Sequence, residues 1–311
     1  MNPELAAGDL VQLIDSKGRR YQGVLTSGKE FHFHSGIITH DELIGLPEGS
    51  SINSSRRQSY TVVRPTLSEF VLKMPRGAQV IYPKDLGPIL MIADIGPGVR
   101  VLESGVGSGA LSMAMLRAGA EIVGYEIRED FANRAVANVE RFLGAEALER
   151  YSVELRDCYE GIDESGLDRV VLDLPEPWQV VPHASAALRP GGLFLAYTPS
   201  VMQVSQLRES LAANGFFAAE TLEVLNRGWH VEGQAVRPDH RMVGHTGFLT
   251  HARRSAPPPG ARPRTRPRAS SRRARGSRST RRAGGARRPR ARPRPTRDRA
   301  CASWGRGPRR R

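Results

Sequence analysis

The chain has 311 residues, of which 39% are hydrophobic, enough for one large domain or two with a packed core. No window approaches the roughly 18 consecutive apolar residues of a membrane span, and the N-terminus lacks a basic-then-apolar secretory signal. We therefore expect a soluble cytoplasmic protein without membrane contact. Cys158 and Cys301 are far apart and have no CxxC partner, so neither disulfides nor a cysteine-based zinc site is indicated, and no metal site is expected.

The formal net charge of +14 is distributed unevenly along the sequence. Residues 255–311 contain 21 arginines and one acid, Asp298, which makes +20 and leaves −6 for residues 1–254. Because this segment is also dense in proline and poor in apolar residues, we expect a disordered basic tail. It could assist RNA association through phosphate contacts, or it could be an extension without function.

Short apolar stretches separated by turn signals fill the first 64 residues. They include "LVQLID", "YQGVL", "FHFHSG" and "YTVVRP", which have the length and spacing of short strands. Residues 1–64 are therefore predicted to form a small β-rich domain.

From Pro65 onward, predicted strands alternate with longer predicted helices. The strands are "RVLESG", "EIVGYEI", "YSVELRD", "DRVVLDL" and "GGLFLAYT", with a last pair around "WHVEGQAVRP" and "TGFLTHAR". The helices are "SGALSMAMLRAG", "REDFANRAVANVERFLG" and "SVMQVSQLRESLAANG". This alternation predicts an α/β domain over residues 65–254, with a mostly parallel sheet covered on both faces and ligands at the carboxyl ends of its strands.

The first of these strands runs into a glycine-rich loop, "ESGVGSGAL". Gly105, Gly107 and Gly109 allow a tight turn and a close approach to a ligand at the next helix N-terminus. Because Ala110 can replace a final glycine, the loop also fits a dinucleotide fingerprint. Glu126, at the end of the next strand, does not decide between them, since it could accept the ribose hydroxyls of NAD or of S-adenosylmethionine.

Two further carboxylates favour S-adenosylmethionine. Glu103 lies two residues before the first glycine, which is typical of methyltransferases, where it is close to the methionine end of the cofactor. Asp157 ends the third strand, where it can accept from the adenine amino group. Carboxylates at three successive strand ends would repel a pyrophosphate. The alternative is that they are helix caps and surface acids.

The fourth strand ends in "VLDLPEPW", which places Asp173 where a methyltransferase of this architecture meets its acceptor. Pro175 and Pro177 remove donors and fix φ, so an extended, rigid segment rather than a helix is expected after Asp173. Methyltransferases that act on amino groups carry a "DPPY"-like tetrapeptide here, which holds a planar nucleobase. Trp178 could face the substrate, or it could belong to the core.

Five stretches resemble the tRNA (adenine-58-N1)-methyltransferase family in its bacterial and archaeal form. They are "RGAQVIYPKD", "VLESGVGSGAL", "YEIREDFANRAVANV", "VLDLPEPW" and "RPDHRMVGHTGFL", and the resemblance covers roughly residues 11–254. It implies a small β-rich N-terminal domain, a Rossmann-like class I methyltransferase domain, S-adenosylmethionine as cofactor, tRNA as substrate and a homotetramer. The family loop usually reads "EAGTGSG"; this chain has Ser104 and Val106 instead, and Val106 removes a hydroxyl.

The resemblance also implies roles for single residues. Gln79, Ser108 and Asp173 would contact the cofactor together with the rest of the glycine loop. Tyr82 would lie near the target base and could stack on it, or it could be an ordinary half-buried aromatic. The residues His240 and His245 would line the acceptor pocket, or they could be hydrogen-bonded histidines near a strand turn.

Adenine N1 carries an in-plane lone pair, so its methylation needs no prior proton abstraction. We expect a direct displacement in which Asp173 orients the base and stabilises the developing positive charge. Two other functions stay open, a NAD-dependent oxidoreductase and a non-catalytic tRNA-binding subunit. The intact glycine loop and Asp173 argue against the second.

Overall fold

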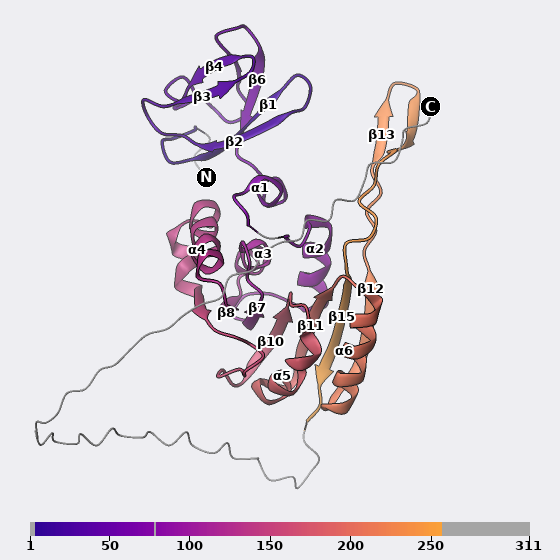
Figure 1. Ribbon diagram of the computed structural model, residues 1–311. Coiled ribbons are helices and arrows are strands. Elements are labelled where there is room, and N and C mark those ends of the chain that lie inside the picture. The colour runs from indigo at the N-terminus through magenta and orange to yellow at the C-terminus, as the bar shows by residue number, and fades with distance from the viewer. Residues whose placement is uncertain (1–3, 78, 257–311) are drawn as a thin grey trace, which may run out of the picture. The chain divides into compact units, whose positions relative to one another are not determined.

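The computed structural model describes residues 4–77 and 79–256, and its first part is β-rich, as predicted. A four-stranded antiparallel sheet has the order β2-β1-β6-β5, and β3 and β4 form a separate hairpin (Figure 1). The strands are β1 (Leu10–Asp15), β2 (Arg20–Val24), β3 (Glu30–Phe33), β4 (Gly36–Thr39), β5 (Ser51–Asn53) and β6 (Ser59–Val63). Their inward side chains, among them Leu13, Tyr60 and Val62, form a core of their own.

The second part contains a seven-stranded sheet of order β12-β15-β11-β10-β7-β8-β9. Strands β11, β10, β7, β8 and β9 are parallel, whereas β15 is antiparallel to β11 and β12. The strands are β7 (Arg100–Ser104), β8 (Glu121–Glu126), β9 (Tyr151–Leu155), β10 (Leu167–Leu172), β11 (Leu188–Thr198), β12 (Phe216–Glu223) and β15 (Phe248–Arg254). The mostly parallel sheet is therefore confirmed.

Helices cover both faces of this sheet (Figure 1). They are α1 (Leu67–Lys73), α2 (Pro83–Ile92), α3 (Ala110–Arg117), α4 (Glu129–Leu143), α5 (Val181–Ala187) and α6 (Val201–Ala213), with 3₁₀ turns η1 (Ala145–Arg150) and η2 (Pro177–Gln179). Along β10, Val171 packs into the core with α2, α3 and α4, while Val170 and Leu172 pack into the core with α5 and α6. This two-sided burial is what a near-continuous apolar strand such as "RVVL" predicts.

Two expectations about local structure need correction. The predicted strand "WHVEGQAVRP" is a hairpin of two strands, β13 (Trp229–Glu232) and β14 (Ala235–Pro238), because Gly233 adopts a positive φ of 54° at the turn between them. The segment after Asp173 is not extended throughout, since Pro177 begins η2. Proline has the φ that the first helical position requires, so it starts this turn instead of preventing it.

None of the described helices is long and apolar enough to cross a membrane. The basic tail, predicted to be disordered, lies outside the described residues except for Ser255 and Ala256. Cys301 also lies outside them. Cys158 is buried, and burial raises the pKa of its thiol to about 11.

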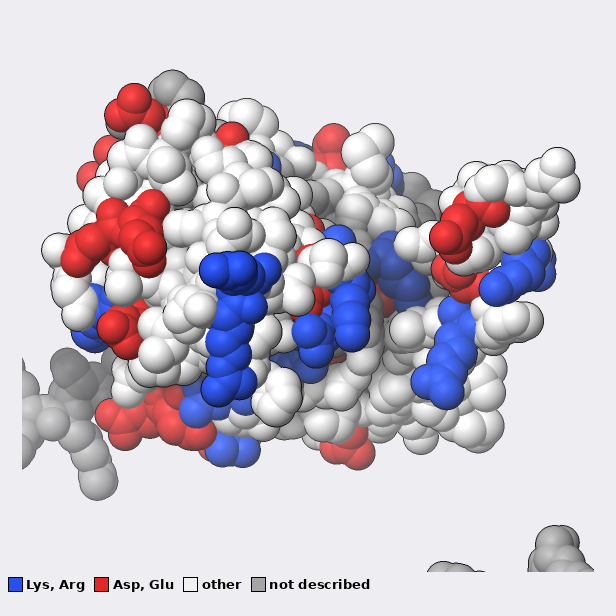
Figure 2. Space-filling view, turned by 90° about the horizontal axis from the view of Figure 1, so that it is seen from above, with Lys and Arg blue, Asp and Glu red and all other residues white. Residues whose placement is uncertain are grey.

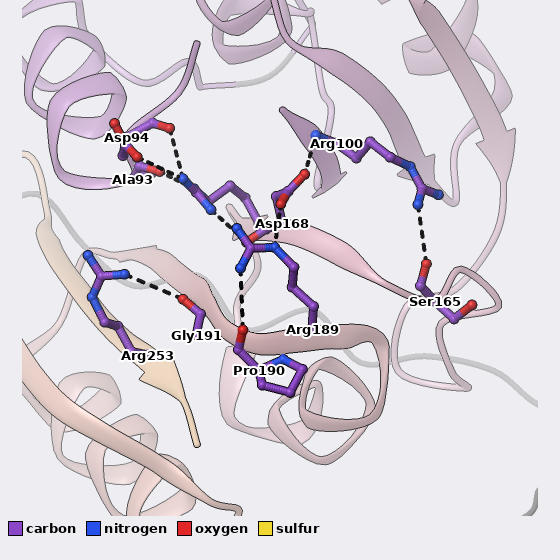
Figure 3. Close-up of polar contacts among 10 residues, drawn as sticks. Ala93, Asp94, Arg100, Ser165, Asp168, Arg189, Pro190, Gly191 and Arg253 are labelled. Atoms are coloured by element: carbon purple, nitrogen blue, oxygen red, sulfur yellow. Dashed lines mark hydrogen bonds and ion pairs between the residues drawn. The ribbon is translucent and has the colours of Figure 1, made fainter. Parts of the chain in front are cut away.

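A buried arginine fastens the end of α2 to the sheet. Arg169 on β10 donates to the backbone carbonyls of Ala93, Asp94 and Asp168, and its Nη2 lies 3.0 Å from the Asp94 carboxylate. Figure 3 shows the same network continuing to Arg189, whose Nε lies 2.6 Å from Asp168 Oδ1. These contacts join α2, β10 and the start of β11.

Replacing Arg169 with methionine should lower the free energy of unfolding by about 1–3 kcal/mol, because buried carbonyl oxygens would lose their donors. Urea denaturation measures this change. The matched control is Arg208→Met on the exposed side of α6, where we expect less than about 0.5 kcal/mol. An unchanged stability of Arg169→Met would contradict the assigned role.

Candidate active site

The glycine loop and Asp173 meet at the carboxyl ends of β7 and β10, which are neighbouring parallel strands. The Asp173 amide donates to Ser104 O at 2.9 Å, so the chain after β10 stays beside the loop. Gly105 has a φ of 83°, and a Cβ there would lie 2.1 Å from Asp173 O. Only glycine allows this backbone contact.

Two adjoining cavities open at this end of the sheet. Both are lined by Gln79, Val80, Ile81, Gly105, Gly107 and Asp173. The smaller one is also lined by Glu103 and Ser108, and the larger one, of about 490 Å³, also by Glu126, Tyr197 and Thr246. The structure therefore brings together most of the residues that the sequence predicts for the cofactor.

Buried polar groups distinguish the smaller cavity. Glu103 is 1% exposed and accepts a hydrogen bond from Ser112 Oγ at 2.6 Å. Burial raises its pKa to about 8, although the Ser112 hydroxyl opposes the shift, and burial raises the pKa of Asp173 to about 7. The Ser108 hydroxyl is buried without a hydrogen-bond partner among the described residues. These groups suit a ligand that brings positive charge and hydrogen-bonding atoms.

Cofactor binding should therefore strengthen as the pH rises. Both carboxyl groups are partly protonated near neutral pH in the free protein, and a cationic ligand favours their ionised forms, so binding releases protons. We expect the dissociation constant of S-adenosylmethionine to fall roughly tenfold between about pH 6.5 and about pH 8.5. Isothermal titration in buffers of different ionisation enthalpy measures both effects. Glu103→Gln should lose most of this dependence; an unaltered dependence in that variant would contradict the assignment.

Glu126 joins the loop to the next turn. Its carboxylate accepts from the amides of Gly107 and Arg128, each at 3.0 Å. Glu126 is the last residue of β8 and lines the larger cavity. The sequence predicts that its carboxylate accepts hydrogen bonds from the ribose hydroxyls of the cofactor. Asp157, by contrast, accepts from the Tyr159 amide at 2.8 Å and lines neither of these cavities.

The residues predicted for the acceptor are dispersed. Tyr82 is half-buried at the N-cap of α2. It lies close enough to Tyr197 to contribute to the raised pKa of that hydroxyl, after burial as the main cause. Trp178 is half-buried in η2, and its carbonyl accepts from Ser210 on α6. His240 is exposed beyond β14. None of these three lines the two cavities, so their substrate roles stay predictions.

His245 does not line the larger cavity but contacts Pro199, a residue that does. One ring nitrogen lies 2.7 Å from the carbonyl of Pro199, which lines the larger cavity, and the other lies 2.7 Å from Glu223 Oε1. These two acceptors, the carbonyl first, raise the pKa of His245. The imidazole thus holds the segment before β15 against the end of β11.

Tyr197 and Thr246 are among the cavity residues that were not singled out from the sequence. Tyr197 lies near the carboxyl end of β11, beside the strand that carries Asp173, so the strand-end rule could have identified it. Thr246 lies inside "GHTGFL", directly after His245.

Comparisons with known proteins identify the family of this chain. Residues 59–237 match the family described as tRNA methyltransferase complex GCD14 subunit, and residues 4–52 match the TrmI-like N-terminal family. The tRNA (adenine(58)-N(1))-methyltransferase TrmI of Thermus thermophilus is 36% identical over 78% of this chain and 95% of its own length. This chain belongs to the tRNA (adenine-58-N1)-methyltransferase family. The predicted family is thereby confirmed.

Other members and structures of this class are similar along most of their length. The Methanocaldococcus jannaschii tRNA (adenine(57)-N(1)/adenine(58)-N(1))-methyltransferase TrmI is 33% identical over 78% of this chain and 93% of its own. A Thermotoga maritima structure described as a SAM-dependent O-methyltransferase has a TM-score of 0.78 at 32% identity, covering 82% of this chain and 96% of that one. The Aquifex aeolicus tRNA (m1A58) methyltransferase TrmI has a TM-score of 0.72 at 28% identity, covering 82% and 100%. The predicted Rossmann-like methyltransferase fold is confirmed.

The departure from the family loop at Val106 has a structural explanation. This side chain is 4% exposed and packs in the core, where a Cβ on Gly124 of β8 would lie 2.8 Å from Val106 Cγ2. The valine side chain therefore packs against Gly124 of β8 and occupies the space that a side chain there would need.

Proposed function

We propose that this chain transfers a methyl group from S-adenosylmethionine to N1 of adenine-58 in the T-loop of tRNA. The observation that carries the proposal is the position of Asp173, which lines both cavities with its backbone against the glycine loop. Membership of the family supports the choice of substrate.

The residues present fit the cofactor. The carboxylate of Glu103 and the free hydroxyl of Ser108 would hold the methionine end, and Glu126 would accept from the ribose hydroxyls. Gln79 and the glycine loop would line the path between them. When bound, S-adenosylmethionine supplies a sulfonium methyl as the electrophile.

Asp173 would orient the acceptor. Its carboxylate can accept a hydrogen bond from the adenine amino group, which places the N1 lone pair and counters the positive charge that grows on the ring. This role requires the ionised carboxylate. Because burial raises the pKa of Asp173, a cation bound nearby would increase the fraction of Asp173 that is ionised. Tyr82 would contribute a stacking surface nearby.

The homotetramer is part of the proposal, and the β13–β14 hairpin supports it. Figure 1 shows this hairpin extending beyond the seven-stranded sheet, and its apolar side chains Trp229, Val231 and Val236 are exposed. An exposed apolar group of this kind is typical of a protein–protein contact. We also propose a cytoplasmic location and domain limits at residues 1–64, 65–254 and 255–311.

Binding of tRNA would rely on separate basic groups. On the face in Figure 2, Lys and Arg side chains form several separate groups across the middle and right of the view and do not merge into one basic surface, while Asp and Glu gather mainly toward its edges. This agrees with the charge of −6 for residues 1–254. Phosphate contacts from several subunits would then position the RNA.

The deciding experiment is methylation of unmodified tRNA, followed by nucleoside mass spectrometry and mapping of the position. We expect 1-methyladenosine at position 58 and none in a tRNA with uridine there. Binding of NAD without S-adenosylmethionine would favour the oxidoreductase, and tRNA binding without methylation would favour a non-catalytic subunit.

A further inference from the structure

A buried ion pair at the start of α2 has no part in the functions described so far. Asp85 is 0% exposed, and the Lys84 ammonium lies 2.8 Å from its Oδ1 and donates to Val224 O at 2.7 Å. Thr246 Oγ1 donates to the other carboxylate oxygen, Oδ2, at 2.8 Å. Buried ion pairs contribute little to stability relative to apolar side chains, so this one suggests a further role.

The hydrogen bonds to Asp85 run in one direction, from Lys84 and Thr246 to the carboxylate. A carboxylate paired with an ammonium group only accepts, so the single hydroxyl proton of Thr246 is committed to it. The hydroxyl of Tyr197 lies beside Thr246: a Cβ on the next residue, Gly247, would be 2.8 Å from it, and both side chains line the larger cavity. Because the Thr246 proton is committed to Asp85, a hydrogen bond between the two hydroxyl groups requires Tyr197 to donate, which leaves the Tyr197 oxygen free to accept from another donor.

Tyr197 has little freedom to turn away from this arrangement. Its ring lies against the backbone of Gly247, where a Cβ would be 2.4 Å from Tyr197 Cζ. Tyr197, Thr246 and Asp173 line the same cavity. The cavity therefore presents two acceptors, the Asp173 carboxylate and the Tyr197 hydroxyl oxygen.

We propose that Asp85 and Thr246 are positioning residues that orient the Tyr197 hydroxyl to accept from the 6-amino group of the target base, beside Asp173. The inference rests on the proposed function. An adenine amino group has two N–H donors and can satisfy both acceptors, whereas the 6-oxo group of guanine or hypoxanthine would face them with another acceptor. The network thus selects a 6-aminopurine.

The test combines protein variants with two substrates. Thr246→Val removes the hydroxyl at nearly constant volume, and Thr246→Ser retains it. The matched control is Thr250→Val on β15, which removes a buried hydroxyl whose partner, Thr221 Oγ1 at 2.9 Å, lies outside the cavity. The substrates are tRNA with adenine at position 58 and the same tRNA with unsubstituted purine, which has N1 but no amino group.

We expect Thr246→Val to lower kcat/KM roughly tenfold on the adenine substrate and less than about twofold on the purine substrate. Thr246→Ser and Thr250→Val should stay within about twofold of wild type on both. Equal losses of Thr246→Val on both substrates, no loss on adenine, or a serine variant as impaired as valine would overturn the proposal.

Asp85→Asn extends the test to the carboxylate, because an amide can donate to Thr246 and reverse the hydroxyl. If it folds by thermal melting, it should show the same selective loss on adenine, and wild-type selectivity would remove Asp85 from the network. If it does not fold, the Thr246 variants decide. A wild-type protein that does not methylate adenine-58 would instead refute the proposed function.

Discussion

Asp173→Ala should lower the rate of adenine methylation about a thousandfold while the affinity for S-adenosylmethionine changes by only a few-fold. The carboxylate would orient the base and counter charge that appears mainly in the transition state, and loss of one such preorganised group costs about 10²–10³ in rate. Single-turnover methylation of saturating tRNA measures the rate, and isothermal titration measures cofactor binding.

The control for this variant is Glu121→Ala. Glu121 is an exposed carboxylate at the opposite end of β8 from Glu126, so its removal changes the net charge equally without touching the site. It should methylate at the wild-type rate. A rate of Asp173→Ala within about tenfold of wild type would exclude Asp173 from the chemistry.

Gly105→Ala should weaken cofactor binding by about a hundredfold. The new methyl group would lie 2.1 Å from Asp173 O at a φ of 83°, so the loop or the Asp173 backbone must move, and both line the two cavities. Displacements of this size disrupt several ligand contacts at once. Titration of the folded variant with S-adenosylmethionine measures the loss.

Gly166→Ala is the control for Gly105→Ala. It introduces the same kind of backbone strain, from a positive φ, without displacing neighbouring backbone. Gly166 also has a positive φ, of 67°, but a Cβ there would meet only the tip of Arg100, at 3.9 Å. It should lose about 1–3 kcal/mol of stability and bind the cofactor normally. If both alanine variants bound equally well, the close contact at Gly105 would have no functional importance.

Much of the fold follows from local patterns that the sequence states directly. The apolar stretch before Asp173 is a strand buried on both faces, and the glycine loop lies between β7 and α3, as expected. Strand β12 and helices α1, α2 and α5 are among the elements that were not predicted. Helices α2 and α5 contain internal or early prolines, which weaken the helical signal, and α1 is only seven residues long.

The grouping of the residues proposed to bind the cofactor was predictable because they lie at the ends of strands in one sheet. Parallel strands align their carboxyl ends, so Glu103, Glu126 and Asp173 come together whatever the packing of the helices. Asp157 obeys the same rule in sequence, yet the turn after β9 directs its carboxylate to the Tyr159 amide.

The sequence by itself determined the α/β architecture, the family and the position of Asp173 beside a glycine loop, because each depends on a contiguous motif or on strand order. Only the tertiary structure decided which side chains join Asp173 in the larger cavity. Thr246 and Asp85 are separated by 161 positions, and Tyr197 meets them from a different strand. Their pairing depends on how the segment before β15 packs on α2, and such long-range packing leaves no periodic signal in the sequence.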